Sequence, residues 1–410
     1  MDNIKRKEMK WIYEDIVGKI PPFSLLSYQY SILLQLFFLL VLGLTLGFIF
    51  DLKIMSLLYG SLGIMVAVMW SMLILQLGPT LRQFRAPLSK YENELLEKYK
   101  EILFHKNHYE ALPGLVIFIL FMPYIFYYNP GLLDYWIGKT HNPVLLVFMS
   151  LLIWDICYRM GLGIWTSVLA LWRSINLGKI AKNRIELEHT PYTELRALRK
   201  LDINNVFFGL ISLLLIPILQ IDRVLVSVIF VFVFFITFTS IISAHLISKV
   251  PWLPPDIYNL VKESSFAYIG TSNHGMPHIT PVVYVFDGQN IFFNTSKEAK
   301  KLKIMRENNK IAFLIDKRDM SNIYENKAVL FTGKVQVFGL LDIPLRFIQM
   351  LRARKLFQEK YPEYTQKYST SKSELPKAWQ LTPIIARILI QVKPYKIIYW
   401  RGAKQITVPV

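Results

Sequence analysis

The chain has 410 residues, of which 53% are hydrophobic and 14% aromatic. This length suggests at least two domains, and the composition indicates membrane-spanning helices rather than a wholly soluble protein. The formal net charge is +18, which the excess of Lys and Arg in the inner loops of a membrane protein explains without nucleic-acid binding. The single cysteine, Cys157, excludes an intrachain disulfide and a thiolate metal cluster.

Long apolar runs fill residues 1–250 and predict an α-helical transmembrane bundle. Each run is close to the roughly 20 residues that a bilayer needs, although the third and the fifth are short. The predicted spans are at about 31–50, 54–78, 113–129, 143–168, 203–220 and 224–248.

Basic residues are concentrated in every second segment that flanks or joins these spans. Eighteen of them lie in the N-terminal tail and in segments 79–112 and 173–202, whereas the alternate loops carry three. The larger set is Lys5, Arg6, Lys7, Lys10, Lys19, Arg82, Arg85, Lys90, Lys98, Lys100, Lys106, Arg173, Lys179, Lys182, Arg184, Arg196, Arg199 and Lys200, and the smaller is Lys53, Lys139 and Arg223. We therefore predict a multi-pass protein of the cell membrane, surrounded by lipid, with both termini in the cytoplasm.

Two features of the membrane half are polar. The stretch "KYENELLEKYKEIL" (90–103) has an apolar side with Leu95, Leu96 and Tyr99, so it predicts a helix on the membrane surface, beneath the bundle, or extending a span. Asp155 and Arg159 are four residues apart on the fourth span. They form either a polar site in the bundle or an intrahelical ion pair that fixes packing. A transmembrane haem pathway is not expected, because only one histidine, His245, lies in a span.

The sequence changes character at "KVPWLPPD". Pro251, Pro254 and Pro255 predict a linker at 251–256. Short β-rich runs follow, with "SNHGMP" and "DGQN" as hairpin connections, and they predict a small antiparallel barrel over 257–410. The runs are "FAYIGT", "HITPVVYVF", "IFFNT", "IAFLI", "AVLFTGKVQVF" and "ARILIQVKPYKIIYW".

A lysine-rich helix is predicted after "IFFNT". Thr295 is its expected N-cap, with Glu298 three residues later as in a capping box. Cations at a helix N-terminus are unfavourable unless an anion lies among them, so a phosphate held by Thr295, Ser296 and the lysines is one interpretation. A solvated basic helix near anionic lipid is the other.

Residues from about 257 to 402 resemble the pyridoxamine 5′-phosphate oxidase-like family of flavin-binding split β-barrels. The resemblance rests on the order and spacing of several stretches. These are "FAYIGTSNHGMPHITPVVYVFDGQNIFFNT", "TSKEAKKLKIMRENNKIAFLI", "VLFTGKVQVFG", "EKYPEY" and "ILIQVKPYKIIYW".

The resemblance implies an FMN site and a homodimer paired through the barrels. The implied phosphate ligands are Thr295, Lys300 and Lys301, to which the helix start adds Ser296, and the implied ring contacts are Ile279, Thr280, Pro281, Val282, Val283 and Asn294. Related barrels take deazaflavin, haem or no cofactor, which remain alternatives.

The chain departs from the family at two points. The family's usual Ser-Arg-Lys is Ala299-Lys300-Lys301 here, and Ala328 stands where a polar residue often faces the ring. Residues for pyridoxamine phosphate oxidation are not evident, so a vitamin B6 enzyme is not predicted.

The remaining motifs support little further chemistry. His274 and His278 flank a turn without an obvious third metal ligand, and no hydrolase constellation or catalytic residue stands out. The sequence thus predicts a membrane-anchored FMN-dependent oxidoreductase whose substrate and donor are unknown. The alternatives are a transporter or channel regulated by a flavin- or nucleotide-sensing barrel, and a degenerate barrel used only for dimerisation.

Overall fold

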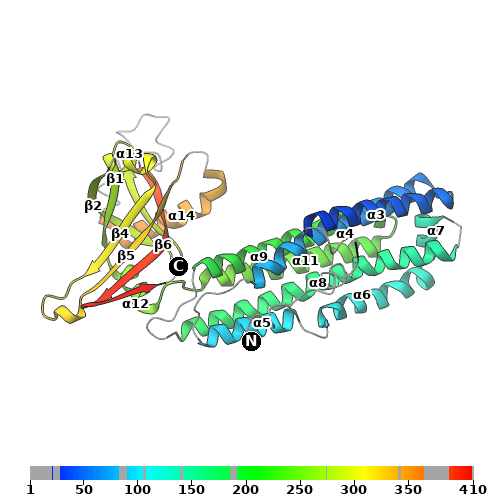
Figure 1. Cartoon of the computed structure of the whole chain (residues 1–410), viewed down its shortest axis with the longest axis horizontal. Helices are drawn as coiled ribbons and strands as arrows, with labels where there is room; N and C mark the ends of the chain where they lie inside the picture. Colours follow the sequence, from blue (N-terminus) through cyan, green and yellow to red (C-terminus); the bar gives the residue numbers. More distant parts are fainter. Residues whose placement is uncertain are drawn as a thin grey trace. The chain divides into compact units, whose positions relative to one another are not determined.

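The computed structural model describes residue 21 and residues 28–82, 90–104, 108–138, 142–184, 192–273, 275–339, 343–363 and 387–408. The chain divides into two compact units. The helical unit comprises Met1–Arg85, Lys90–Ile180 and Glu194–Ser248, and the second unit comprises Ala86–Ser89, Ala181–Thr193 and Lys249–Val410. Figure 1 shows the helices of the first and the sheet of the second. The basic residues of the N-terminal tail, Arg85, Lys106, Lys139 and His274 lie outside the described residues.

The helical unit is built from long helices joined by short turns. Its elements are α3 (Tyr28–Ile49), α4 (Ile54–Arg82), α5 (Lys90–Leu103), η2 (Tyr109–Ala111), α6 (Leu112–Pro123), η3 (Tyr124–Tyr128), α7 (Gly131–Ile137), α8 (Pro143–Lys182), α9 (Tyr192–Ile211), η4 (Ser212–Leu215), α10 (Ile216–Leu219) and α11 (Arg223–Lys249). All six apolar runs of the sequence are therefore helical.

Five helical segments among the described residues are long and apolar enough to cross a membrane. They are Ile54–Leu73, Tyr109–Tyr128, Pro143–Lys182, Glu194–Leu219 and Arg223–Lys249, and Leu34–Ile49 is a shorter apolar helix. The predicted helical bundle is confirmed, with five or six candidate spans according to how α3 is counted. The helix α8 has 40 residues and is about 60 Å long, so it extends well beyond a hydrocarbon core of about 30 Å.

The amphipathic helix α5 packs against the helical unit. Leu95, Leu96 and Tyr99 are buried, so the apolar side predicted from the sequence faces other helices. The Arg173 guanidinium of α8 lies 5.0 Å from the Tyr99 ring centre. A helix lying alone on the membrane surface would leave this side on lipid, so the packed alternative is the correct one.

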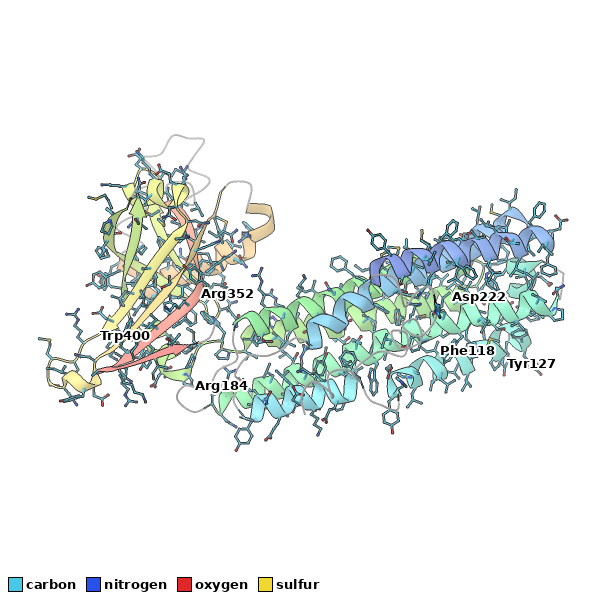
Figure 2. All side chains as sticks on the ribbon, viewed as in Figure 1. Phe118, Tyr127, Arg184, Asp222, Arg352 and Trp400 are labelled. Carbon is cyan, nitrogen blue, oxygen red and sulfur yellow. The ribbon has the colours of Figure 1, made fainter. Side chains whose placement is uncertain are left out.

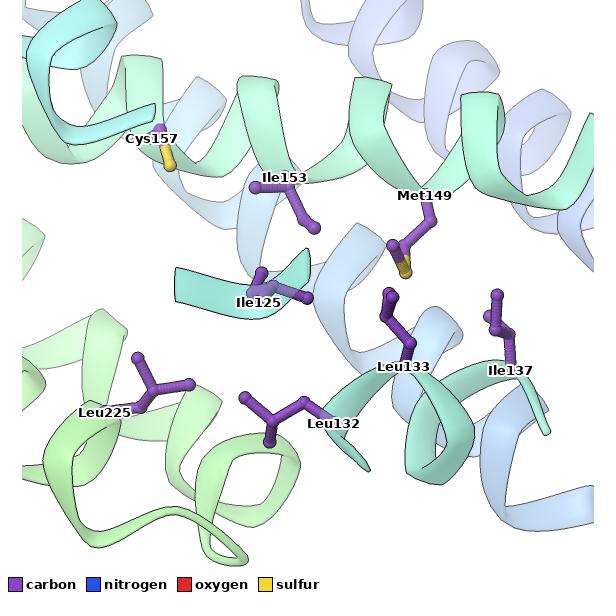
Figure 3. Close-up of a cluster of buried hydrophobic side chains, with 8 residues drawn as sticks. All are labelled: Ile125, Leu132, Leu133, Ile137, Met149, Ile153, Cys157 and Leu225. Atoms are coloured by element: carbon purple, nitrogen blue, oxygen red, sulfur yellow. The ribbon is translucent and has the colours of Figure 1, made fainter. Parts of the chain in front are cut away.

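Helices of the bundle approach closely in two places. Met149, Ile153 and Cys157 project from one side of α8 towards Ile125 and residues of α7 (Figure 3). Further along α8, a Cβ at Gly161 would collide with the backbone of Gly114 in α6.

At the start of α11, Asp222 caps the helix by accepting a hydrogen bond from Val224 N at 2.8 Å (Figure 2).

The second unit contains an antiparallel seven-stranded sheet. Its strands are β1 (Phe266–Asn273), β2 (Met276–Phe286), β3 (Ile291–Ser296), β4 (Lys310–Lys317), β5 (Lys327–Val337), β6 (Arg387–Arg401) and β7 (Lys404–Val408). The order is β3-β2-β1-β4-β5-β6-β7, and an additional β3–β6 pairing closes the sheet into a barrel. The predicted split barrel is confirmed, whereas β7 and the helix α14 (Ile343–Lys360) were not predicted.

The barrel has two apolar cores. Alternate residues of the strands, including Ile269, Phe313 and Phe331, fill its interior. The opposite face of β2 and β3 packs under α14, where Phe292 contacts a cluster with Met350, Ala353 and Phe357.

The predicted linker is packed within the second unit. Val250, Trp252 and Leu253 are buried, Trp252 Nε1 donates to Gln289 O at 2.8 Å, and Gln289 Nε2 donates to Val250 O at 2.7 Å. Gln289 belongs to the β2–β3 turn, so these bonds attach the segment to that hairpin before α12 (Pro255–Glu263) begins.

Candidate functional site

The proposed phosphate residues lie where β3 turns into α13 (Lys300–Glu307). Thr295 belongs to the strand and pairs with Ile388 of β6, and the N-cap of α13 is Ala299, which makes no side-chain capping bond. The predicted Thr295–Glu298 capping box is therefore wrong. The β3–β6 pairing keeps Thr295 extended, and its hydroxyl is not used as a helix cap.

The Thr295 hydroxyl is buried and unsatisfied. The residue is 4% exposed, and its Oγ1 has no hydrogen-bond partner within the described part of the chain. Thr280 Oγ1 and His278 Nδ1, both from β2, are buried and unpartnered in the same way. Because Tyr284 of β2 pairs with Phe293 of β3, strand alternation puts Thr280 and Thr295 on one face of the sheet. Buried polar atoms without partners are rare, so two such hydroxyls on one face fit a polar ligand.

The turn and the first helical turn supply positive charge. Lys300 and Lys301 are the first two residues of α13, whose first turn contains no acidic residue. The Lys300 side chain is exposed, and Lys301 is half-buried. The backbone N–H groups of a helix start and the positive end of its dipole add to these charges. Leu302 and Met305 are buried, so the apolar side of α13 holds the lysines at this edge.

The remaining ring residues alternate between the two faces of β2. Ile279 and Pro281 are exposed on the outer face, opposite Gly270 and Tyr268 of β1. Val282 is buried on the inner face with Thr280. A flat ring along β2 can therefore meet side chains of one set only, and the other set can contribute through its backbone. Val283 of β2 lies on the outer face, and so do Asn294 and Ser296 of β3.

Two predicted features add no polar group. Ala328 lies in β5 between Asp316 of β4 and Trp400 of β6 (Figure 2), so its position offers only a methyl group. His278 belongs to β2, and no cluster of three possible metal ligands occurs among the residues that the structure describes.

A lysine lies against aromatic rings at the end of α14. Lys360 Nζ donates to Ser264 O at 2.6 Å and lies 4.6 Å from the ring centre of Tyr284. Burial lowers the pKa of Lys360 to about 8. Tyr361 donates to Tyr284 O at 2.8 Å, and burial raises the pKa of Tyr361 to about 12.

In the helical unit, Asp155 and Arg159 form the predicted pair. Arg159 Nε and Nη2 donate to the two carboxylate oxygens at 2.9 and 3.0 Å, and Nη1 donates to Ser71 Oγ of α4 at 2.7 Å. Arg159 is 3% exposed and Asp155 34%. The pair therefore also links two helices.

A second charged cluster was not predicted. Arg173 Nη2 donates to both carboxylate oxygens of Asp202 at 2.9 and 2.8 Å, and Ser243 Oγ donates to Asp202 at 2.8 Å. The Arg173 and Asp202 side chains are 0% and 1% exposed. Arg173, predicted as one of the basic residues of the inner segment 173–202, is a buried residue of α8. Arg159, Thr166 and Arg173 are spaced seven residues apart, which puts them on one face of α8. This spacing could have indicated from the sequence that Arg173 is buried.

Comparisons with known proteins identify both halves. The family of unknown function DUF7530 matches residues 7–243, and the pyridoxamine 5′-phosphate oxidase family matches residues 253–347. No curated protein matches the chain. The second match confirms the resemblance of the C-terminal unit.

Solved structures also resemble the chain. A FAD-binding protein from Mesorhizobium loti is 14% identical, with 35% of this chain and 91% of that one covered and a TM-score of 0.28. A heme-binding protein from Mycobacterium smegmatis is 12% identical, with 37% and 56% covered and a TM-score of 0.28. A protein of the pyridoxinephosphate oxidase family from Clostridium acetobutylicum, related to general stress protein 26, is 16% identical, with 38% and 92% covered and a TM-score of 0.27.

The first family match covers more than half of the chain and coincides with the helical unit, while the second falls on the barrel. The protein belongs to the family of unknown function DUF7530 and carries a C-terminal split barrel of the pyridoxamine 5′-phosphate oxidase type.

Proposed function

We propose that this protein is a membrane-anchored flavoprotein whose barrel binds FMN for hydride or electron transfer. The observation that carries the proposal is the buried, unpartnered hydroxyl of Thr295 beside the Lys300–Lys301 helix start. The family match at residues 253–347 supports the same cofactor class. The free N–H groups and positive dipole end of the helix start favour an anionic group, so a phosphorylated flavin fits better than an unphosphorylated ring.

The chain's residues would bind and orient the cofactor. The Thr295 hydroxyl would donate to a phosphate oxygen, and the ammonium groups of Lys300 and Lys301 would neutralise the phosphate charge. The exposed outer face of β2, with Ile279 and Pro281, would cover one side of the ring and exclude water. When bound, FMN would supply the redox chemistry itself.

A homodimer through the barrels is part of the proposal. Phe266, Tyr268 and Ile279 expose large apolar side chains on the outer face of β1 and β2, between 44% and 69% of each. Exposed apolar groups gathered on two neighbouring strands are typical of a protein interface. A second copy would cover them and enclose the ring against β2.

The site is tested by flavin binding to the full-length protein in detergent. We compare Lys300→Ala/Lys301→Ala with Lys303→Ala, which removes an exposed lysine of the same helix. A charge-assisted hydrogen bond contributes about 1.5–3 kcal/mol, so the double variant should bind FMN about 100-fold or more weakly. Thr295→Val should weaken binding about tenfold, and Lys303→Ala should leave it unchanged.

The outcomes separate the alternatives. Visible flavin bands with released FMN in the wild type, lost in the double variant, support the proposal. Equal FMN affinity in the double variant and the wild type contradicts this phosphate site, and a released deazaflavin or haem contradicts FMN. A colourless protein that takes up no FMN and remains dimeric would favour a barrel used only for dimerisation.

The barrel and both termini are proposed to be cytoplasmic. The basic residues of the inner segments outnumber those of the outer loops seventeen to three once the buried Arg173 is left out. Cys157 is buried, so a single Met320→Cys residue on the barrel reports its side of the membrane. An impermeant maleimide should label it in inside-out vesicles, and labelling in intact cells would contradict the orientation.

A regulated transporter is the second candidate. The supporting observation is the Asp155–Arg159 pair in a span, because ionisable groups there are costly and often functional. Flux in proteoliposomes that depends on added flavin and is lost in Asp155→Asn would support it. Flavin reduction without such flux would leave the oxidoreductase.

A further inference from the structure

The helical unit contains a partly open apolar cavity of about 190 Å³. Its walls come from α3, α4, α6, α7, α8, α11 and the η4–α10 segment, and nearly all of the lining is hydrocarbon. An apolar cavity of about 150 Å³ in a soluble protein stays dry and binds benzene, so this one is large enough for an apolar ligand. Figure 3 shows part of its wall, where Met149, Ile153 and Cys157 project from α8.

The cavity is elongated along the helices. Its lining on α8 runs from Leu145 to Met160, a rise of about 22 Å at 1.5 Å per residue. On α4 it runs from Ser56 to Ile64, about 12 Å. The cavity is long, narrow and parallel to the apolar helices, so an extended hydrocarbon chain fits it better than a compact ring-shaped ligand.

Polar groups gather at one end of the cavity, near the start of α4. Ser56 is 7% exposed, and its hydroxyl has no hydrogen-bond partner in the described parts of the chain. At the same end, Tyr59 and Tyr135 share a hydrogen bond of 2.6 Å. Ser61, one turn further along α4, is the next hydroxyl of the lining.

We propose that this cavity holds the hydrocarbon chain of one bilayer lipid, with its polar end at Ser56. The spans surround the cavity with hydrocarbon, so a lipid is the apolar molecule at hand. The single polar end matches an amphipathic chain, and the Ser56 hydroxyl donates to the oxygen where the chain joins its headgroup. Tyrosines are favoured at the level of lipid headgroups, which agrees with Tyr59 and Tyr135 at that end.

Gly60 offers a way to fill the cavity. It lines the cavity in α4, and a Cβ there would meet no atom within 4 Å. Gly60→Leu therefore puts a side chain where the lipid chain would lie without a clash at its Cβ. Gly178→Leu is the matched control, because Gly178 is also helical, also has nothing within 4 Å of its Cβ, and lies outside the cavity.

The test measures lipid retained by the full-length protein. Wild type, Gly60→Leu and Gly178→Leu are extracted, washed in detergent, and analysed by mass spectrometry for bound phospholipid. We expect about one lipid per chain in the wild type and the control, and at least tenfold less in Gly60→Leu. Ser56→Ala should weaken retention about two- to tenfold, through one lost hydrogen bond. Equal retention in Gly60→Leu and wild type, or none in wild type, would overturn the proposal.

A second measurement does not depend on the folding of a variant. A phospholipid with a diazirine near the middle of one chain is incorporated with the wild-type protein into nanodiscs and photolysed. Crosslinks concentrated between Leu145 and Met160 of α8 support the proposal. Crosslinks spread evenly over the exposed faces of the spans contradict it. Neither measurement involves the barrel, so either result leaves the flavin proposal unaffected.

Discussion

Removing the Asp202 carboxylate should destabilise the helical unit strongly. The perturbation is Asp202→Asn, which keeps the side-chain volume and removes the charge that faces Arg173. In the native protein Arg173 Nη2 lies 2.9 and 2.8 Å from the two carboxylate oxygens, and both side chains are almost completely buried. After the change, the guanidinium faces only neutral acceptors, which are the new amide oxygen and hydroxyls such as those of Tyr99 at 3.4 Å and Ser174 at 3.1 Å, so its buried charge is uncompensated.

The magnitude follows from the burial of the remaining charge. Breaking a buried ion pair by removing one partner costs about 3–5 kcal/mol. A domain of this size loses roughly 2–4 °C in Tm per kcal/mol, so a fall of about 6–20 °C is expected. Arg173→Met should cost a similar amount. The double variant Arg173→Met/Asp202→Asn should be more stable than either single variant, because it leaves no unpaired charge.

The assay is thermal unfolding of the four proteins in one detergent, followed by tryptophan fluorescence. Asp51→Asn is the control, because it makes the same chemical change at an exposed residue of the helical unit and should shift stability by less than about 0.5 kcal/mol. If the two single variants lowered Tm additively in the double variant, Arg173 and Asp202 would not interact and the reasoning would be refuted.

Three other outcomes follow from contacts already described. Lys360 titrates at about 8 when folded and 10.5 in its unperturbed state, so folding releases its proton between these values. The Tm difference between wild type and Lys360→Met should therefore shift in favour of wild type as pH rises from 8 to 10.5, and a constant difference would contradict this. Gly161→Ala should lower Tm of the helical unit by overpacking against Gly114, at a cost of about 1–3 kcal/mol or more, whereas Gly178→Ala should not. Trp252→Ala should cost the barrel about 3–5 kcal/mol, as measured by its own unfolding transition, because the indole is 2% exposed.

Local patterns predicted most elements of the barrel. The six strands expected from alternating or β-branched runs are present, because burial on one face imposes that alternation whatever the partner strand is. The helix α14 was missed although Met350, Ala353 and Phe357 recur at helical spacing and are buried under it. The "EKYPEY" stretch, which the resemblance assigns to the family's later helix, overlaps only the last two residues of α14. The strand β7 is five residues long and follows a turn at Gly402, and such a short element gives little periodic signal.

The candidate site shows why local patterns can mislead. Thr295 and Glu298 have the spacing of a capping box, yet Thr295 pairs with Ile388, more than ninety residues later. This long-range pairing keeps the strand extended for one residue more, and the helix starts without a side-chain cap. The same pairing buries the Thr295 hydroxyl without a partner. The sequence identified Thr295 as a candidate ligand. The burial of its unpartnered hydroxyl, however, depends on pairing with β6, which local spacing does not predict.

The two buried ion pairs of the helical unit differ in a way that separates their roles. Asp155 is 34% exposed, whereas Asp202 is 1% exposed and shares its partner Arg173 with hydroxyl groups of neighbouring helices. An ion or proton can reach a carboxylate only from a surface or a cavity, so Asp155 meets this requirement and Asp202 does not. If the helical unit transports anything, its charged contact is therefore expected at Asp155. The Arg173–Asp202 pair, which joins α8 to α9 and, through Ser243, to α11, acts in packing instead.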